Sequence, residues 1–460
     1  MGRKIQVCAL SMIAAFGYSA SAFAQAPADA PNTTAPAAPT PPPTVPPTVP
    51  PEPKTEPDVT GAAAAPAAPP IAHEPDPVPV APAPDAPAPT AFEPLKIESK
   101  NGSASLKIGL LLQPQFETIG SASATSSGST NNLFLRRTRL LVGGTLFKDF
   151  EYFFDTDAPN LFHTDPANAN AKGLQVMFVQ DAMATWKAYE DMIKFDAGYM
   201  LTPGAHNALQ GAGTLLGLDY FSNSFNHSNA FNASFPPVGR DLGFEVRGLL
   251  LDNHIEYRAG LFQGYRKPAV APAMGSSNGE VASQNMFRFA GRIQINLLDA
   301  ETGFFYAGTY LGKKKIASVG AALDMQSEYK HWAVDGFLDM PVGPGTITAQ
   351  VNYSKWTGGD FLPVTAAMPP VSVLPSQSAI MAEAGFRFDA FPIAPIVKFE
   401  QLGFGDNDNK TTRIGGGLAY FPYGHNINVK AMFTNINIKT PPADAVSQNQ
   451  FQLQWQLYFY

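Results

Sequence analysis

The sequence predicts an all-β fold, a 16-stranded antiparallel transmembrane β-barrel, and three observations carry this prediction. The C-terminal segment 451–460 alternates between large apolar and amide side chains. The chain starts with the pattern of an export signal, and no apolar run beyond Ala24 is long enough for a spanning helix. An exported chain without such a helix is either soluble or a closed barrel, because only closure satisfies strand backbone groups in lipid.

The C-terminal segment reads as a strand with one lipid-facing side and one wet side. Its apolar side consists of Phe451, Leu453, Trp455, Leu457 and Phe459, and its polar side of Gln452, Gln454, Gln456 and Tyr458. Successive side chains on a strand point to opposite faces, so this pattern suits a barrel wall between lipid and a lumen. It also resembles the C-terminal signal by which bacterial outer-membrane barrels are recognised, although Tyr460 follows the last lipid-facing aromatic.

Residues 1–24 predict a secretory signal peptide. Arg3 and Lys4 give the positive start, 7–20 is a short apolar core, and 22–24 is a small-x-small cleavage site. The chain's one cysteine, Cys8, lies inside this segment. The mature chain therefore needs no disulfide and offers no thiolate metal site.

Residues 25–94 are dominated by Pro and Ala, and we expect them to form a disordered periplasmic linker. Proline fixes φ and removes backbone donors, so this segment cannot build a packed core. One interpretation is a tether that contacts peptidoglycan, and the other, which we favour, is an inert linker. From 95 to 460 proline thins out while Gly, Phe, Tyr and Asn rise, so this range is expected to be the barrel domain.

The strands can be placed by the phase of their alternation. A charge on the apolar face costs about 2–4 kcal/mol at the bilayer midplane, so the phase is strongly set. The expected strands are 105–116, 133–147, 150–158, 174–187, 192–201, 240–251, 254–265, 285–298, 316–327, 331–340, 345–356, 378–388, 394–403, 410–421, 426–437 and 448–460.

One further candidate strand, 304–311, would make the number odd, whereas bacterial single-chain barrels have even numbers. We therefore interpret 299–315 as one long periplasmic connection. Short turns such as 148–149, 252–253 and 422–425 then share the periplasmic side, and long loops such as 118–132 lie outside. A soluble sandwich, the competing interpretation, would have shorter and more even turns.

Several motifs together resemble the family of phosphate-selective porins O and P. They are LRRTRLLVGGTLFKDFEY (135–152), FDAGYMLTPG (195–204), GRDLGFEVRG (239–248), YRAGLFQG (257–264) and TYLGKKK (309–315). The resemblance spans nearly all of 105–460 and leaves out the Pro/Ala linker. It implies a homotrimeric 16-stranded porin with a long third loop folded inward, embedded with lipopolysaccharide in the outer membrane of a Gram-negative bacterium.

Candidate functional residues follow from strand phase and from this third loop. The pore-lining candidates are Arg137, Arg139, Arg247, Arg258, Arg288, Arg292, Lys398 and Arg413. Inward acids nearly balance them, and the other role, which we favour for most of these residues, is cross-strand ion pairing that holds the wall. The third loop, about 202–239, contains no Lys or Arg, so it holds no strong anion trap. Its constriction candidates are Asp219, Asn223, Phe225, Asn226 and Phe231.

These observations predict a passive porin for small hydrophilic solutes or ions, with phosphate or anion preference expected from the resemblance alone. The alternative is a structural barrel whose linker engages the cell wall without transport. We expect no enzyme, cofactor or metal site, because the seven histidines are scattered and none makes a His-x-x-x-His pair. We also expect no nucleic-acid partner, because the formal charge is −7 and no basic stripe occurs.

Overall fold

The computed structural model describes residues 95–120, 128–165, 168–172, 176–220, 239–264, 287–358, 376–404 and 408–460. The expected signal peptide and Pro/Ala-rich linker lie outside these residues and stay predictions. Within the described part of the chain, no helix is long and apolar enough to cross a bilayer.

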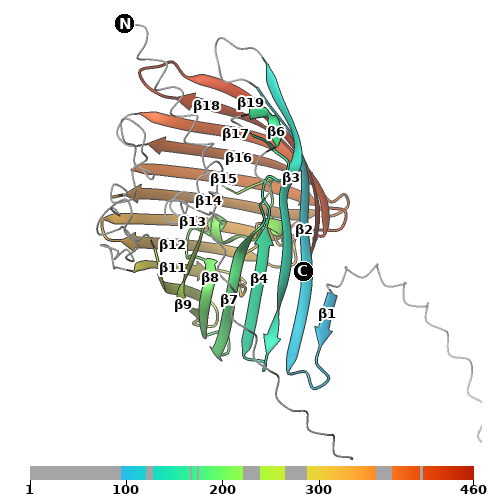
Figure 1. Cartoon of the computed structure of the whole chain (residues 1–460), viewed down its shortest axis with the longest axis vertical. Helices are drawn as coiled ribbons and strands as arrows, with labels where there is room; N and C mark the ends of the chain where they lie inside the picture. Colours follow the sequence, from blue (N-terminus) through green and yellow to red (C-terminus); the bar gives the residue numbers. More distant parts are fainter. Residues whose placement is uncertain are drawn as a thin grey trace, which may run out of the picture. The chain divides into compact units, whose positions relative to one another are not determined.

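Antiparallel strands close into a barrel, which confirms the predicted fold class (Figure 1). Each barrel strand pairs with the next, and the first of them, β2, pairs with the last, β19. Of the 17 strands in this sheet, β1 lies beside β2 without closing the ring, which leaves 16 in the barrel. The barrel strands are β2 (Ala104–Gly120), β3 (Ser129–Leu146), β4 (Phe150–Asp157), β7 (Phe178–Tyr189), β8 (Ile193–Leu201), β9 (Arg240–Leu250), β10 (Ile255–Phe262), β11 (Arg288–Asn296), β12 (Ile316–Gln326), β13 (Tyr329–Val342), β14 (Gly345–Thr357), β15 (Gln377–Phe388), β16 (Ile393–Phe404), β17 (Asn409–Tyr420), β18 (Ile427–Lys439) and β19 (Val446–Phe459).

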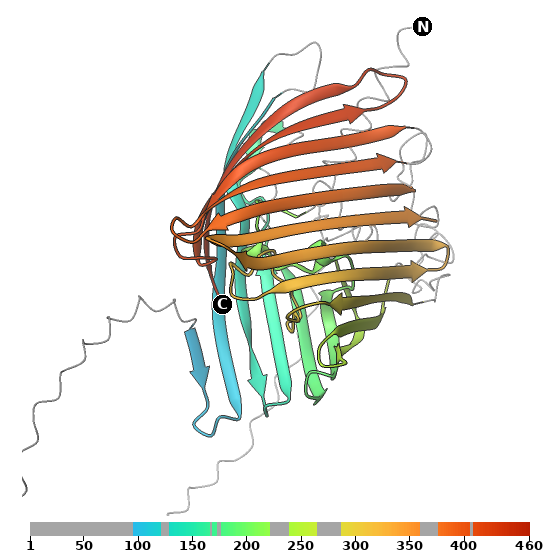
Figure 2. The ribbon, with the colours of Figure 1, turned by 180° about the vertical axis from the view of Figure 1, so that it is seen from behind.

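Three short strands were not expected from the sequence. The first, β1 (Leu95–Glu98), pairs with residues 105–108 of β2, where β19 no longer reaches (Figure 2). The other two, β5 (Thr164–Asp165) and β6 (Asn168–Lys172), pair with each other in the connection after β4. Strands of two to five residues show too few alternations to be recognised by their period.

The outer face of the barrel is apolar and the inner face is polar. Phe244 is 73 % exposed, while its chain neighbour Glu245, on the opposite face of β9, is 2 % exposed. The same contrast separates Ile293 from Arg292 on β11. A wall with apolar side chains outside and charged side chains inside matches a strand between lipid and a lumen.

Short turns gather at one end of the barrel, which we call the short-turn end. The turn between β3 and β4 takes left-handed φ at Phe147 (53°) and Lys148 (63°), and Asp252 (53°) and Asn253 (70°) do the same between β9 and β10. The connection 297–315 lies at this end, and no strand occurs in this fully described range. This agrees with its interpretation as a single connection.

Candidate functional site

The described part of the third loop, 202–220, folds into the barrel. It contains two short 3-10 helices, η1 (His206–Leu209) and η2 (Ala212–Thr214). On the β18 wall, Lys430 Nζ donates to the carbonyl oxygens of Leu215 (2.5 Å) and Gly217 (2.9 Å). Side chains of the wall thereby satisfy loop carbonyls that have no strand partner.

The connection 297–315 enters the lumen from the short-turn end. Arg258 of β10 donates to the carbonyl oxygen of Phe304 at 2.8 Å. The Tyr306 hydroxyl donates to Glu256 at 2.9 Å and accepts from Arg292 at 3.3 Å. The sequence predicted this segment only as a connection, and its place inside the barrel was not expected. Its run of three aromatics, 304–306, was the available signal.

These two inward segments are joined to each other, and we call 206–220 together with 301–310 the inner bridge. Tyr306 N donates to Leu209 O at 2.9 Å, and Gly211 N donates to Tyr306 O at 2.8 Å. Farther along, Thr309 N donates to Thr214 O at 3.1 Å. Three backbone bonds and the side chains described next tie a loop from one end of the barrel to a connection from the other.

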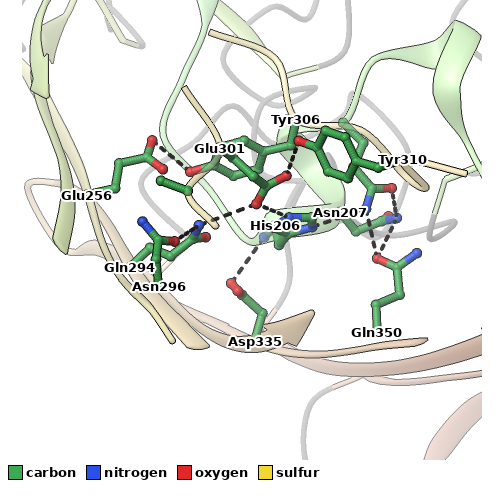
Figure 3. A network of polar contacts seen from close by, with 12 residues as sticks. His206, Asn207, Glu256, Gln294, Asn296, Glu301, Tyr306, Tyr310, Asp335 and Gln350 are labelled. Atoms are coloured by element: carbon green, nitrogen blue, oxygen red, sulfur yellow. Dashed lines mark hydrogen bonds and ion pairs between the residues drawn. The ribbon is translucent and has the colours of Figure 1, made fainter. Parts of the chain in front are cut away.

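A buried His–Glu pair lies at the centre of this junction (Figure 3). His206 Nε2 and Glu301 Oε2 are 2.8 Å apart, and the His206 ring lies between the rings of Tyr306 and Phe337, with centroids 4.7 and 4.1 Å away. Tyr310 donates its hydroxyl to the second carboxylate oxygen of Glu301 at 2.8 Å.

The surroundings of Glu301 favour its ionised form. Burial alone raises the pKa of this carboxyl group, but attraction to His206 and hydrogen bonds from His206, Tyr310 and Gln294 outweigh burial and lower the pKa. Glu301 thus binds three side chains while charged, which holds the inner bridge to the inner wall at β11.

All eight pore-lining candidates lie on inner-face positions, and each has a carboxylate within ion-pair distance. The pairs are Arg137–Asp219 (2.5 Å), Arg139–Asp157 (2.9 Å), Arg247–Asp196 (2.7 Å), Arg258–Glu256 (2.8 Å), Arg288–Asp324 (2.7 Å), Arg292–Asp335 (2.6 Å), Lys398–Glu400 (2.9 Å) and Arg413–Glu400 (3.7 Å). For most of these residues this is the cross-strand ion pairing that we favoured from the sequence. The two roles are compatible for residues that remain partly exposed, such as Arg413.

Asp219 is the one constriction candidate among the described residues, and it bridges Arg136 and Arg137. Burial raises the pKa of Asp219, but the two guanidinium groups outweigh it and hold the pKa well below the usual range. Arg136 was not among the candidates, because strict alternation puts it on the opposite face from Arg137. The register shift between Leu112 and Pro114 marks a β-bulge, which brings both arginines to the same carboxylate. The remaining constriction candidates, Asn223, Phe225, Asn226 and Phe231, lie outside the described residues.

No family model and no curated protein matches the chain. The resemblance to phosphate-selective porins O and P therefore stays a prediction. Among solved structures, the outer membrane channel DcaP of Acinetobacter baumannii is similar, at 13 % identity over 79 % of this chain and 99 % of that chain, with a TM-score of 0.48.

Two further solved structures are similar to the same degree. An anion-selective porin from Comamonas acidovorans has 11 % identity over 77 % of this chain and 100 % of that chain, with a TM-score of 0.48. OprB of Pseudomonas putida has 10 % identity over 76 % and 94 %, also with a TM-score of 0.48.

Proposed function

We propose that this chain is an outer-membrane porin through which small hydrophilic solutes diffuse passively. The observation that carries the proposal is the closed 16-stranded wall, apolar outside and polar inside, with the third loop folded into its lumen. A polar lumen gives a hydrated solute a path that hydrocarbon does not, and an inward loop narrows that path.

The described lumen speaks against a strong preference for anions. Among the buried charged residues of the described chain, 9 are Lys or Arg and 13 are Asp or Glu. A phosphate or general anion preference, which the resemblance implies, needs an excess of positive charge that these residues do not supply. The form of the proposal that we favour is a diffusion channel with weak ion preference.

The experiment is conductance of the purified protein in planar bilayers, with reversal potentials under a KCl gradient. A porin gives stepwise conductance, and the small excess of acidic residues predicts a reversal potential that indicates a weak preference for cations. A reversal potential that indicates strong anion selectivity would instead support a phosphate-selective porin. Absence of any steps from correctly assembled protein would overturn the proposal.

One observation favours the second candidate function, a structural barrel that anchors the cell wall. The inner bridge crosses the lumen and binds both walls, as a permanent plug would. That function predicts assembled protein without conductance and co-sedimentation of the full chain with peptidoglycan. The expected homotrimer and the periplasmic position of the linker belong to the proposal as well. An unheated gel that shows a band of three subunits would support the trimer.

A further inference from the structure

The last strand differs from the rest of the charged lumen. Residues 446–459 include no Asp, Glu, Lys or Arg, and every second residue from 448 to 456 is a glutamine. We call Gln448, Gln450, Gln452, Gln454 and Gln456 the glutamine row. Their even phase is that of the buried residues Gln454 and Gln456, opposite to the exposed residues Phe451 and Trp455, so the row faces the lumen.

The lower part of the row is structural. Gln454 donates to the side-chain oxygen of Gln115 on β2 at 2.8 Å, and Gln456 donates to Gly213 O of the inner bridge at 2.8 Å. Both residues are at most 2 % exposed. These two amides hold the wall and the third loop, and nothing can pass along them while the loop stays in place.

The upper part of the row is partly exposed. Gln448, Gln450 and Gln452 all keep intermediate exposure, toward the long-loop end of the barrel. Gln450 and Gln452 donate to the same Glu117 oxygen, at 2.8 and 3.0 Å, which aligns their amides along the wall. A glutamine amide can make four hydrogen bonds, so each can hold a solute alongside its bond to Glu117.

The fixed charges near this part of the lumen carry both signs and offset one another across the group. Glu117 accepts these two amides and lies 3.7 Å from His163. On the adjacent β3, Arg136 shares Asp219 with Arg137. Arg136 and Arg137 together carry one positive charge more than Asp219, and the Glu117 carboxylate offsets it, so this side of the lumen offers neutral donors and acceptors between fixed charges of both signs.

We propose that the upper glutamine row, Gln448, Gln450 and Gln452, lines the solute path and favours neutral polyhydroxylated solutes, such as sugars and polyols, over ions of the same size. This inference rests on the proposed porin function and gives it a substrate class. A neutral polyol can exchange its bonds to water for bonds to amides at little cost, because amides donate and accept at once. An ion meets fixed charges of both signs there, so it gains little net attraction, and it loses part of its hydration shell.

The test is solute-driven swelling of liposomes that contain the full chain, with sorbitol and potassium gluconate as probes. The two solutes have similar size and hydroxyl count, and only one carries a charged carboxylate. We expect sorbitol to enter faster than gluconate. Replacing Gln448, Gln450 and Gln452 together by Met, which is apolar, unbranched and of similar length, should slow sorbitol by about tenfold, since several hydrogen bonds are lost.

A matched control is Asn449→Leu, on the same strand but on its outer face, which should leave both rates unchanged. A second variant, Gln448→Glu, tests the path without removing hydrogen-bonding capacity. If the row lines the path, this added charge should shift the reversal potential toward cations at low salt. If the triple variant fails to assemble, the reversal potential of Gln448→Glu still tests whether the row lines the solute path.

The possible results distinguish failure of the proposed polyol preference from failure of the porin function on which it rests. Normal conductance with unchanged sorbitol entry in the triple variant would overturn the inference and leave the porin intact. An unchanged reversal potential in Gln448→Glu would overturn it too. A wild-type chain without conductance or swelling would overturn the porin function itself.

Discussion

At the scale of single residues, the lumen is built from charge pairs, and most of the partners come from different strands or from the third loop. Arg247 lies directly opposite Arg258 in the register of β9 and β10. Two cations face to face would repel, and Asp196 beside Arg247 and Glu256 beside Arg258 compensate them. Each such pair stiffens the wall and also sets the local charge that a passing solute meets.

Arg139 offers a direct measurement of this pairing. It lies 2.9 Å from Asp157 and 3.8 Å from Asp155, and all three are nearly buried. Arg139→Gln leaves these acids without their guanidinium partner, so the free energy of unfolding in detergent should fall by about 3–5 kcal/mol. The double variant Arg139→Gln/Asp157→Asn should recover part of that loss.

The same variant has an electrical consequence. Loss of one positive charge should shift the reversal potential of Arg139→Gln toward cations at low salt. The shift should vanish near 1 M, where the Debye length is about 3 Å. A variant as stable as the wild type, with an unchanged reversal potential, would show that the arginine neither holds the wall nor acts on the path.

At the scale of elements, the last two residues at the end of β19 lie on opposite faces of the barrel wall, Phe459 outside and Tyr460 inside. Phe459 pairs with Leu110 on β2, in the outward phase expected for the recognised aromatic. Tyr460 turns inward, where its ring lies 5.5 Å from that of Phe153 and 4.7 Å from the Lys107 ammonium. The extra residue thus packs against the inner wall at the short-turn end.

We expect removal of Tyr460 to preserve insertion into the outer membrane and to lower stability by about 0.5–1.5 kcal/mol, the worth of an aromatic pair. Phe459→Asp should impair insertion, because it places a charge on the lipid face. Heat-modifiable gel migration of outer-membrane fractions measures both effects. Equal insertion of Phe459→Asp and wild type would contradict the assignment of Phe459 as the recognised aromatic.

The junction between the two inward segments should respond to acid. Glu301 has a lowered pKa, so its contribution to stability is fully present above the ordinary carboxyl pKa. That contribution is lost as the pH falls through the lowered value, because protonation weakens its bonds to His206 and Tyr310. We therefore expect the conductance of the wild type to change, with more frequent switching between levels, below about pH 4.

Glu301→Gln is the matched control, because it keeps the shape and removes the charge. At neutral pH it should already show the acid behaviour of the wild type, and it should lose most of the pH dependence. A variant that responds to acid as strongly as the wild type would assign the response to other carboxylates.

The alternation of the sequence was enough to place all sixteen barrel strands, because a strand between lipid and a lumen repeats its polarity every second residue. It was also enough to put Arg137 and Arg139 in the lumen. It did not find the second arginine on Asp219, because a bulge breaks the period at Arg136. The inner bridge was missed too, because contacts such as His206–Glu301 join segments 95 residues apart that have no period of their own.

At the scale of the whole molecule, we expect the barrel and the Pro/Ala-rich segment before it, residues 25–94, to be structurally independent. The described chain begins with β1, which covers the edge of β2 that β19 does not reach. Residues 25–94 are too rich in Pro and Ala to build a core, and at about 3.1 Å per residue they could extend on the order of 200 Å. Such a segment extends the chain away from the barrel without contributing to the folded structure.

Deleting 25–94 behind an intact signal should therefore leave assembly and conductance unchanged, as measured by heat-modifiable migration and planar bilayers. Deleting 25–98 is the matched control, because it also removes β1 and uncovers four residues of β2, 105–108. Exposed strand edges are costly and invite wrong pairing, so the longer deletion should lower stability or yield while the shorter one does not. Equal damage from both deletions would mean that the Pro/Ala segment takes part in assembly, and it would strengthen the case for an anchor over an inert linker.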